Sequence, residues 1–317
     1  MTPLSGFRIA VLVPCYNEAV TIATVVKEFQ AAIPGAPIYV YDNNSKDGTA
    51  AVAREAGAVV RTVKQQGKGN VVRRMFADIE ADIYVLVDGD ATYDALSAPR
   101  LIERLIEEQL DMVVGTRFGE FDQEAFRRGH QFGNWVLTRF VGVIFGRSFT
   151  DMLSGYRVFS RRYVKSFPAL AQGFETETEL TVHALELRMP IDEQVTPYRS
   201  RPEGSVSKLN TYRDGARILR MIFTLVREER PLAFFTLLFA VLATLSVILA
   251  YPIVMTFLQT GLVPRFPTAI LATGTMLLAF LSLAAGFILD TVTNGRREMK
   301  RLFYLSIPAV TRREPAE

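Results

Sequence analysis

The chain has 317 residues, of which 49% are hydrophobic and 22% are charged, and its formal net charge is +3. So small a net charge disfavours a protein that coats nucleic acid. The single cysteine, Cys15, excludes an intramolecular disulfide and agrees with a reducing compartment. No signal peptide is expected, because the first apolar run, residues 9–13, is too short and is broken by Pro14.

The amino-terminal part of the chain alternates short apolar runs with amphipathic segments. Residues 7–14, FRIAVLVP, predict a buried strand, and the apolar spacing of the next segment predicts a helix to about Ile33. Three later runs, PIYVYD, AVVRTV and DIYVLVD, predict further strands with helices between them. This alternation is typical of a doubly wound α/β sheet, and most of it lies in the first 90 residues.

Three polar loops begin where a predicted strand stops. Their sequences are PCYNE, YDNNSKDGT and VDGDATYD. In open α/β sheets, ligands bind outside the carboxyl ends of the strands. We therefore expect these loops to meet at one ligand-binding crevice.

The regular pattern ends after a predicted helix at residues 98–109 and a strand at MVVGTR. Residues 123–146 predict a basic, aromatic helix, and residues 209–230 predict a second basic amphipathic helix. Both patterns suit a membrane interface, although an ordinary surface helix with one face in the core would show the same spacing.

Two apolar stretches, at about 231–258 and 268–292, are each long enough to cross a bilayer core. A buried hairpin of a soluble protein is the alternative. Basic residues flank the pair on both sides, whereas the loop between them holds only Arg265. The positive-inside rule then predicts a multi-pass protein of the inner (cytoplasmic) membrane, with the catalytic domain and both termini in the cytoplasm.

The most informative chemistry lies in Asp88-Gly89-Asp90, directly after an apolar run. Two carboxylates this close repel each other and would repel a diphosphate, at on the order of 4 kcal/mol for one contact at 4 Å and an effective dielectric of 20. A divalent cation removes this conflict, and hard oxygen ligands suit Mg²⁺ or Mn²⁺ bridging to phosphates. A solvated turn is the alternative for any isolated triplet of this kind.

Three other loops carry candidate nucleotide-binding residues. In PCYNE, the ring of Tyr16 can stack on a base, and the carboxylate of Glu18 can accept from a ribose or base. In YDNNSKDGT, Asp42 can read a uracil or guanine edge. Turns that cap helices are the alternative for these two loops. In the third loop, Gly67-Lys68-Gly69-Asn70 opens a helix, where free backbone N–H groups and Lys68 favour an anion.

These motifs, taken in order, resemble those of the family 2 inverting glycosyltransferases of GT-A fold. Within that family they resemble the dolichyl- and polyprenyl-phosphate mannosyl-, glucosyl- and aminoarabinosyltransferases, and the two-span tail is similar to that of the bacterial polyprenyl-phosphate glucosyltransferases. The segments that carry the resemblance are PCYNE (14–18), DNNSKDGT (42–49), GKGN (67–70), VDGD (87–90), GTR (115–117), DMLSGYR (151–157) and RPEGSVSKL (201–209).

The resemblance implies a role for each matching residue. The residues expected to bind the nucleotide-sugar are Pro14, Tyr16, Glu18, Asp42, Lys68, Gly69 and Asp88. Asp88 and Asp90 are expected to bind the metal. The residues expected to contact the acceptor phosphate are Arg117, Arg128, Ser154, Arg201 and Lys208. Catalysis itself would rest on Asp90, Arg117 and Asp151.

Two acidic groups leave alternatives open. Asp151 stands where many relatives keep a candidate base, but a phosphate monoester is already largely ionised at pH 7 and needs positioning more than deprotonation. Asp151 could instead orient Arg157 or a helix terminus. The alternating Glu175, Glu177 and Glu179 suggest a solvated face or framing of the acceptor site rather than a metal site.

The sequence therefore predicts an α/β GT-A (Rossmann-like) catalytic domain at 1–208, an interface helix at 209–230, two transmembrane helices within 231–295 and a basic cytoplasmic tail at 296–317. The expected activity is inverting transfer of a sugar from a UDP- or GDP-sugar to a polyprenyl (undecaprenyl or dolichyl) phosphate. The alternatives are a processive polysaccharide synthase and a non-enzymatic scaffold that binds nucleotide-sugar. The sugar, the base, the lipid length and the oligomeric state, including a homo-oligomer, stay open.

Overall fold

The computed structural model describes residues 6–117, 138–139, 141–142, 145–146, 149–169, 176–202, 220 and 223–311. The chain divides into two compact units. The first comprises residues 1–218 together with 300–317, and the second comprises residues 219–299. The two predicted basic helices, at 123–146 and 209–230, lie for the most part outside the described residues.

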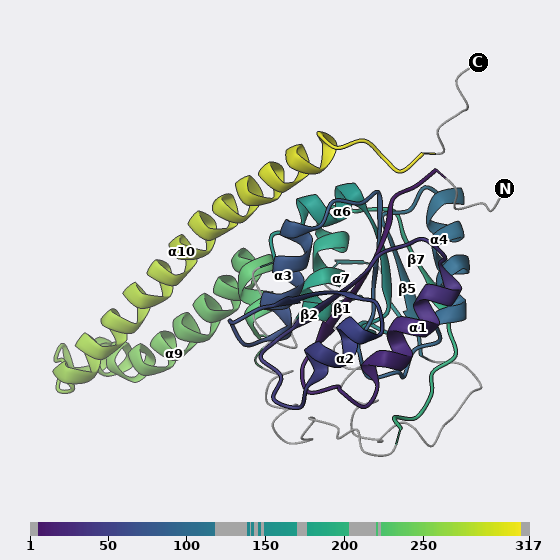
Figure 1. Cartoon of the computed structure of the whole chain (residues 1–317). Coiled ribbons are helices and arrows are strands. Elements are labelled where there is room, and N and C mark those ends of the chain that lie inside the picture. The colour runs from purple at the N-terminus through teal and green to yellow at the C-terminus, as the bar shows by residue number, and fades with distance from the viewer. Residues whose placement is uncertain are drawn as a thin grey trace. The chain divides into compact units, whose positions relative to one another are not determined.

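The first unit is built on a seven-stranded mixed sheet (Figure 1). Its strand order is β3-β2-β1-β4-β6-β5-β7. Strand β6 runs antiparallel to both of its neighbours, and every other pair is parallel. The strands are β1 (Ile9–Cys15), β2 (Ile38–Asp42), β3 (Val59–Thr62), β4 (Ile83–Leu86), β5 (Met112–Thr116), β6 (Arg157–Ser160) and β7 (Ile191–Val195).

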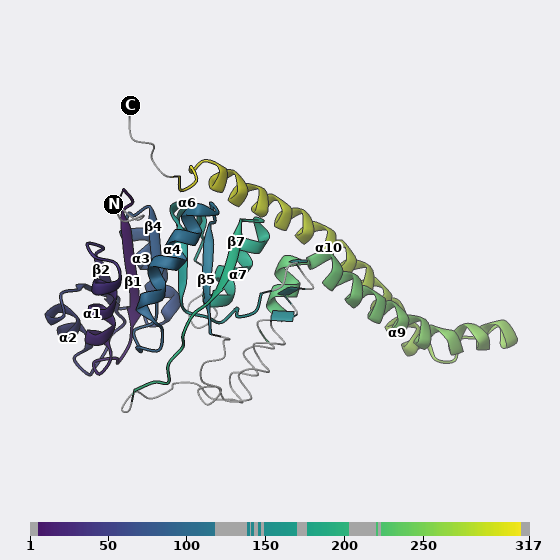
Figure 2. The same ribbon diagram turned by 90° about the vertical axis from the view of Figure 1, so that its right-hand side faces the viewer.

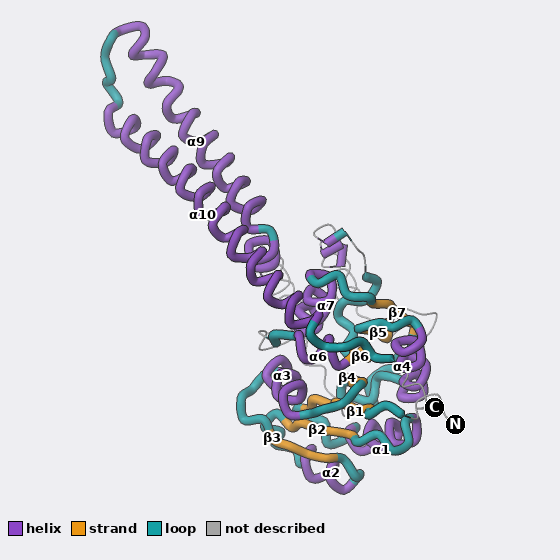
Figure 3. Tube along the Cα trace, turned by 90° about the horizontal axis from the view of Figure 1, so that it is seen from above, coloured by secondary structure: helices purple, strands orange, loops and turns teal. Residues whose placement is uncertain are grey.

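Helices cover both faces of this sheet. Figure 3 shows α1, α2 and α4 on one face and α3, α6 and α7 on the other. The α-helices of this unit are α1 (Ile22–Ala32), α2 (Thr49–Glu55), α3 (Lys68–Asp78), α4 (Ala98–Glu107), α6 (Arg161–Ser166) and α7 (Thr176–Glu186). Because both faces are covered, all residues of β1, β4 and β5 are buried, which explains why these strands read as continuous apolar runs.

The carboxyl ends of β1, β2 and β4 lie at the same edge of the sheet. Cys15 of β1 is in register with Asp42 at the end of β2. The hydroxyl of Thr21 donates to the carbonyl of Gly89 at 2.7 Å, and the backbone N–H of Asn17 donates to Ser45 Oγ at 2.8 Å. The prediction that the three polar loops meet is therefore confirmed.

The second unit contains two long apolar helices that run side by side (Figure 2). Helix α9 spans Pro231–Thr260, and α10 spans Phe266–Leu305, of which the last turns belong to the first unit. By length and composition, both could cross a membrane. Within this unit, Ser246 Oγ donates to the carbonyl of Ala272 at 2.7 Å, and Arg297 pairs with Glu229 at 2.9 Å.

Helix α10 is longer than the predicted second span, which was expected to end at residue 292. The helix continues through the basic segment at 296–301 as far as Leu305. Within the first unit, its final turns contact the catalytic domain: Lys300 pairs with Glu186 at 2.6 Å, and Tyr304 donates to Asp111 at 2.6 Å. Much of the expected tail is therefore ordered helix.

Candidate active site

The acidic pair, Asp88 and Asp90, follows the end of β4. Lys68 Nζ, at the start of α3, lies 2.5 Å from Asp88 Oδ1. Arg201 Nη2 lies 2.7 Å from Asp90 Oδ2, and the Thr92 hydroxyl donates to Asp90 Oδ1 at 2.6 Å. Each carboxylate of the pair is thus bound by a cationic side chain from a distant segment.

Lys68 contacts a second carboxylate, that of Glu177 in the first turn of α7, also at 2.5 Å. Burial by itself would lower the pKa of Lys68, but the charges and hydrogen bonds of Asp88 and Glu177 raise it above its ordinary value. The ammonium is therefore fully charged at physiological pH. A carboxylate–ammonium–carboxylate cluster joins β4, α3 and α7 at this edge of the sheet.

Two glycines let the backbone approach these carboxylates closely. A Cβ atom placed on Gly155 would lie 2.3 Å from Asp88 Oδ2. One placed on Gly89 would lie 2.3 Å from Glu18 Oε2 and 2.6 Å from Cys15 Sγ. No side chain fits at either position, so the loop after β1, the acidic pair and the 151–157 loop are in direct contact.

Asp42 ends β2 and is 4% exposed. Its Oδ2 accepts from the backbone N–H of Ser45 at 3.2 Å, whereas its buried Oδ1 has no hydrogen-bond partner among the described residues. A buried carboxylate oxygen without a donor is costly unless a ligand supplies one. Such an oxygen beside the strand-end loops suits an N–H or O–H donor of a nucleoside.

Cys15 lies beneath the same loops and is buried. Burial raises the pKa of its thiol well above its ordinary value, and the charge of Glu18 adds to this shift. The thiol is therefore neutral at physiological pH and is not an activated nucleophile.

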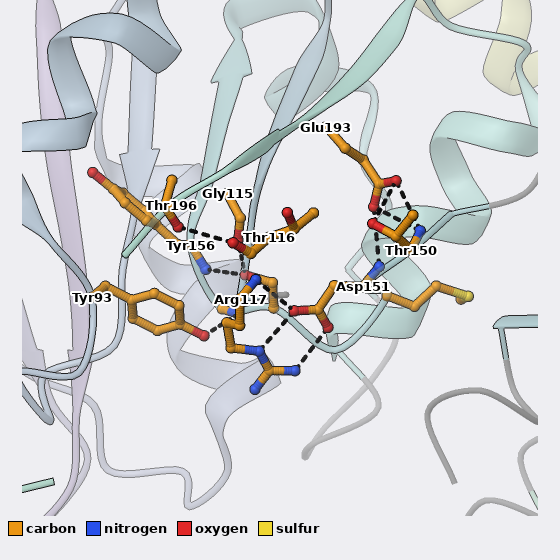
Figure 4. A network of polar contacts seen from close by, with 12 residues as sticks. Tyr93, Gly115, Thr116, Arg117, Thr150, Asp151, Tyr156, Glu193 and Thr196 are labelled. Carbon is orange, nitrogen blue, oxygen red and sulfur yellow. Dashed lines mark hydrogen bonds and ion pairs between the residues drawn. The ribbon is translucent and has the colours of Figure 1, made fainter. Parts of the chain in front are cut away.

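Arg117 and Asp151 form a buried ion pair beyond the end of β5 (Figure 4). Arg117 Nε and Nη2 donate to the two oxygens of Asp151 at 2.7 and 2.8 Å, and the backbone N–H of Arg117 donates at 3.2 Å. Burial alone would lower the pKa of Arg117, but Tyr93 and Asp151 raise it well above its ordinary value. The guanidinium therefore carries its full charge at a fixed position.

Neighbouring groups hold the loop that carries Asp151. The carboxylate of Glu193 accepts from the backbone N–H groups of Thr150 and Asp151, at 2.8 and 3.1 Å. The Ser154 hydroxyl donates to the carbonyl of Gly115 at 2.6 Å, and the backbone N–H of Gly155 donates to the hydroxyl of Tyr93 at 2.8 Å. Figure 4 shows this network around Arg117.

Arg157 supports the loop from inside the domain. Its fully buried guanidinium donates to the carbonyls of Met152 and Ser154, at 2.6 and 3.0 Å, and to the Thr181 hydroxyl at 2.9 Å. Burial lowers the pKa of Arg157 from its ordinary value. The acceptors of these bonds are carbonyls and a hydroxyl, while the carboxylate of Asp151 is bound by Arg117.

The structure brings several of the predicted site residues together. Lys68 meets Asp88, Asp90 meets Arg201, and Arg117 meets Asp151. Gly69 is buried in the first turn of α3, Pro14 is buried at the end of β1, and Tyr16 is half-buried. Two predicted acceptor residues, Arg128 and Lys208, lie outside the described residues.

The contact of Glu177 with Lys68 was not predicted. Of the two alternatives for the glutamates, a solvated face does not hold for Glu177, which is 7% exposed and bound to Lys68, and framing of the acceptor site stays a prediction. The alternating pattern in TETEL hides this, because on a helix residues two apart point in different directions. The one signal that sets Glu177 apart is its position in the first turn of helix α7.

The carboxylates of Asp88 and Asp90 fit a divalent cation whose other ligands come from the substrate and water. Among the described residues, no group of three or more His, Cys, Asp or Glu side chains could hold a metal. Asp88 and Asp90 offer carboxylate oxygens, which suit Mg²⁺ or Mn²⁺, and such ions commonly complete their shells with phosphate oxygens and water. The residues therefore fit an ion that binds together with a diphosphate.

A mixed α/β sheet with polar loops at its carboxyl edge defines a protein of GT-A-like fold. The sequence pattern described as "Glycosyl transferase family 2" matches residues 10–167. The glycosyltransferase AglJ of Haloferax volcanii is 33% identical over 300 residues, covering 93% of this chain and 97% of the relative. The chain belongs to glycosyl transferase family 2, which confirms the resemblance seen in the sequence, and it is a transferase.

Two further proteins are similar to this chain. A dolichyl-phosphate hexose transferase of Haloferax volcanii is 27% identical over 230 residues, covering 73% of this chain and 99% of the relative. Glucosyl-3-phosphoglycerate synthase of Mycobacterium tuberculosis, solved with Mn²⁺, UDP-glucose and phosphoglyceric acid, covers 71% of this chain and 80% of its own. Its TM-score is 0.56 and its identity 24%, which shows a shared fold.

Proposed function

We propose that the chain transfers a sugar from a UDP- or GDP-sugar to a polyprenyl phosphate, with inversion at the anomeric carbon. The product would be a polyprenyl-phosphate-sugar that serves as a donor for cell-envelope glycosylation. The observation that carries the proposal is a set of groups at the carboxyl edge of the sheet: an acidic pair bound by Lys68, a buried Asp42 oxygen without a donor among the described residues, and an Arg117 held by Asp151. The two membrane-length helices support a lipid acceptor.

The donor side is assigned to the loops after β1, β2 and β4. Asp42 would bind the base or ribose through its free oxygen, with Pro14, Tyr16 and Glu18 shaping the nucleoside site. Asp88 and Asp90 would hold Mg²⁺ or Mn²⁺, which when bound neutralises charge on the leaving diphosphate. Lys68 and the N–H groups at the start of α3, including that of Gly69, would bind the diphosphate oxygens.

The acceptor side is assigned to Arg117 and its surroundings. Asp151 holds the Arg117 guanidinium in one orientation, so that it can direct the acceptor phosphate oxygen at the anomeric carbon. Arg128, Ser154, Arg201 and Lys208 would supply the remaining contacts to the phosphate. Because the phosphate is already ionised, positioning and charge stabilisation supply the catalysis, and Asp151 acts through Arg117 rather than as a base.

The membrane assignment rests on helices α9 and α10. Both ends of the hairpin carry basic residues, so we propose a multi-pass protein of the inner (cytoplasmic) membrane whose catalytic domain faces the cytoplasm. The relative named as a dolichyl-phosphate hexose transferase supports a polyprenyl acceptor, and the neighbour solved with UDP-glucose supports a nucleotide-sugar donor.

A transfer assay tests this function. The full chain in detergent micelles is incubated with Mn²⁺, a panel of labelled UDP- and GDP-sugars, and undecaprenyl phosphate or dolichyl phosphate. We expect label in the organic phase with the phosphorylated lipids and none with the free polyprenol. Asp90→Asn should abolish transfer, whereas Asp192→Asn, a carboxylate of β7 that pairs with Arg104, should leave it unchanged. Absence of product with every donor, despite nucleotide binding, would refute the function and favour a scaffold.

A further inference from the structure

Lys68 occupies an unusual position for a residue assigned to bind an anion. Its ammonium lies between two carboxylates, Asp88 and Glu177, which come from different elements of the fold. The side chains of Lys68, Asp88 and Glu177 are 16%, 28% and 9% exposed, so water screens their charges only in part. Lys68 thus binds Asp88, an expected metal ligand, as well as Glu177.

Two cationic groups already bind the acidic pair. Lys68 and Arg201 bring two positive charges to the carboxylates of Asp88 and Asp90, and Lys68 is shared with a third carboxylate, that of Glu177. A metal ion that approaches the pair must therefore displace the ammonium of Lys68 from Asp88, since like charges at such short distances repel strongly.

Glu177 determines where the displaced ammonium can go. It belongs to α7, separate from the acidic pair, and it contacts Lys68 through its own oxygen, Oε1. When Lys68 leaves Asp88, it can keep this second bond and stay at the start of α3, where the diphosphate is expected.

We propose that Lys68 substitutes for the metal in the ligand-free enzyme, and that Glu177 is the positioning residue that retains its ammonium for the diphosphate. The inference rests on the proposed function of this site. Metal alone then binds weakly, because Lys68 loses a partner without gaining one. A diphosphate supplies the new partner, so metal and nucleotide bind cooperatively, and each strengthens the other by the same factor.

Mn²⁺ binding to the full chain in micelles, followed by electron paramagnetic resonance with and without saturating UDP or GDP, tests this directly. In the wild type, nucleotide should tighten Mn²⁺ binding by at least about tenfold. Lys68→Met should bind Mn²⁺ alone at least about fivefold more tightly than the wild type, and nucleotide, which still supplies phosphate oxygens to the metal, should tighten Mn²⁺ binding by a smaller factor than in the wild type. Lys165→Met, which removes a comparably exposed lysine paired with Glu80, should behave as the wild type.

Glu177→Gln distinguishes two roles of Glu177: holding the displaced ammonium of Lys68, and attracting the metal through its own charge. With Lys68 present, this variant should bind Mn²⁺ alone more weakly than the wild type, because the displaced ammonium has lost its second carboxylate. In the Lys68→Met background, Glu177→Gln should change Mn²⁺ affinity by less than about twofold. Glu186→Gln removes a carboxylate of the same helix that is paired with Lys300, and should leave Mn²⁺ binding unchanged.

The outcomes distinguish this inference from the function on which it rests. If the wild type binds Mn²⁺ with nucleotide, but Lys68→Met binds Mn²⁺ alone no more tightly, the inference is overturned and the proposed function stands. An equal effect of Glu177→Gln in both backgrounds would show that Glu177 acts on the metal directly, and would overturn its positioning role. If neither the wild type nor Lys68→Met binds Mn²⁺ under any condition, both the inference and the metal-dependent function fail.

Discussion

The substitution Asp151→Asn tests whether Asp151 acts by holding Arg117. Replacing Asp151 by Asn keeps the size of the side chain but removes its charge and one of its acceptor oxygens. In the native protein, Asp151 is 0% exposed and receives three hydrogen bonds from Arg117. In the variant, at least one N–H of the guanidinium loses its acceptor, and the buried positive charge loses its counter-ion.

The expected magnitude follows from burial. Breaking a fully buried ion pair by removing one partner costs about 3–5 kcal/mol. The side chain of Arg117 is 17% exposed, and water can solvate part of its charge, so we expect a loss of about 2–4 kcal/mol in the free energy of unfolding. If half of this is also lost from the transition state, transfer slows by about 5- to 30-fold.

A double-mutant cycle measures the pair itself. Unfolding by urea and the initial rate of transfer are compared for Asp151→Asn, Arg117→Met and the double variant, all in the same micelles. If Asp151 acts by holding Arg117, it has little left to do in the Arg117→Met background, and the coupling energy should be about 2–3 kcal/mol.

A base would give a different pattern. If Asp151 removed a proton from the acceptor, Asp151→Asn would slow transfer as much in the Arg117→Met background as in the wild type. It would also abolish the acidic limb of the pH–rate profile, which Arg117→Met would retain. Either result would refute the positioning role.

Three further predictions concern single residues in both units. Gly155→Ala places a Cβ 2.3 Å from an oxygen of the acidic pair, so transfer should fall at least about tenfold with the circular dichroism spectrum unchanged; an active variant would contradict the packing. Burial, with a smaller contribution from a nearby lysine, lowers the pKa of His183 from 6.5 to about 3. At about pH 5 the unfolded state therefore binds a proton at His183 that the folded state does not bind. Lowering the pH from about 7.5 to about 5 should reduce the free energy of unfolding of the wild type by about 2 kcal/mol through this residue. This contribution should be missing in His183→Asn. Gly286→Val builds its Cβ 2.8 Å from the side chain of Phe235 and should lower the melting temperature in micelles, whereas Gly274→Val, with no atom within 4 Å of its Cβ, should not; equal effects would contradict the helix pairing.

Local patterns were enough to predict the first five strands and the meeting of the loops after β1, β2 and β4. Each of those strands is a short run rich in apolar residues that is followed by polar residues, and parallel strands bring such ends to one edge. Strand β6 was missed because Arg157 opens it, and a charged residue does not indicate a buried strand. Its guanidinium is accommodated by two carbonyls of the preceding loop and by the Thr181 hydroxyl of α7, contacts that no local pattern indicates.

Contacts across long sequence separations could not be predicted. The bond between Lys68 and Glu177 joins residues 109 positions apart, and neither motif indicates the other. The length of α10 beyond the predicted span has a different cause. Charged residues at 296–301 end the apolar run, but Arg, Lys and Glu are good helix formers, so the helix continues after the apolar run ends.

The most direct test of the whole account is a structure of the chain with bound Mn²⁺ and UDP or GDP, in which anomalous scattering locates the metal. The account predicts a metal peak bonded to oxygens of Asp88, Asp90 and the diphosphate, with Lys68 released from Asp88. A peak elsewhere, with the two carboxylates still bound to Lys68 and Arg201, would contradict it.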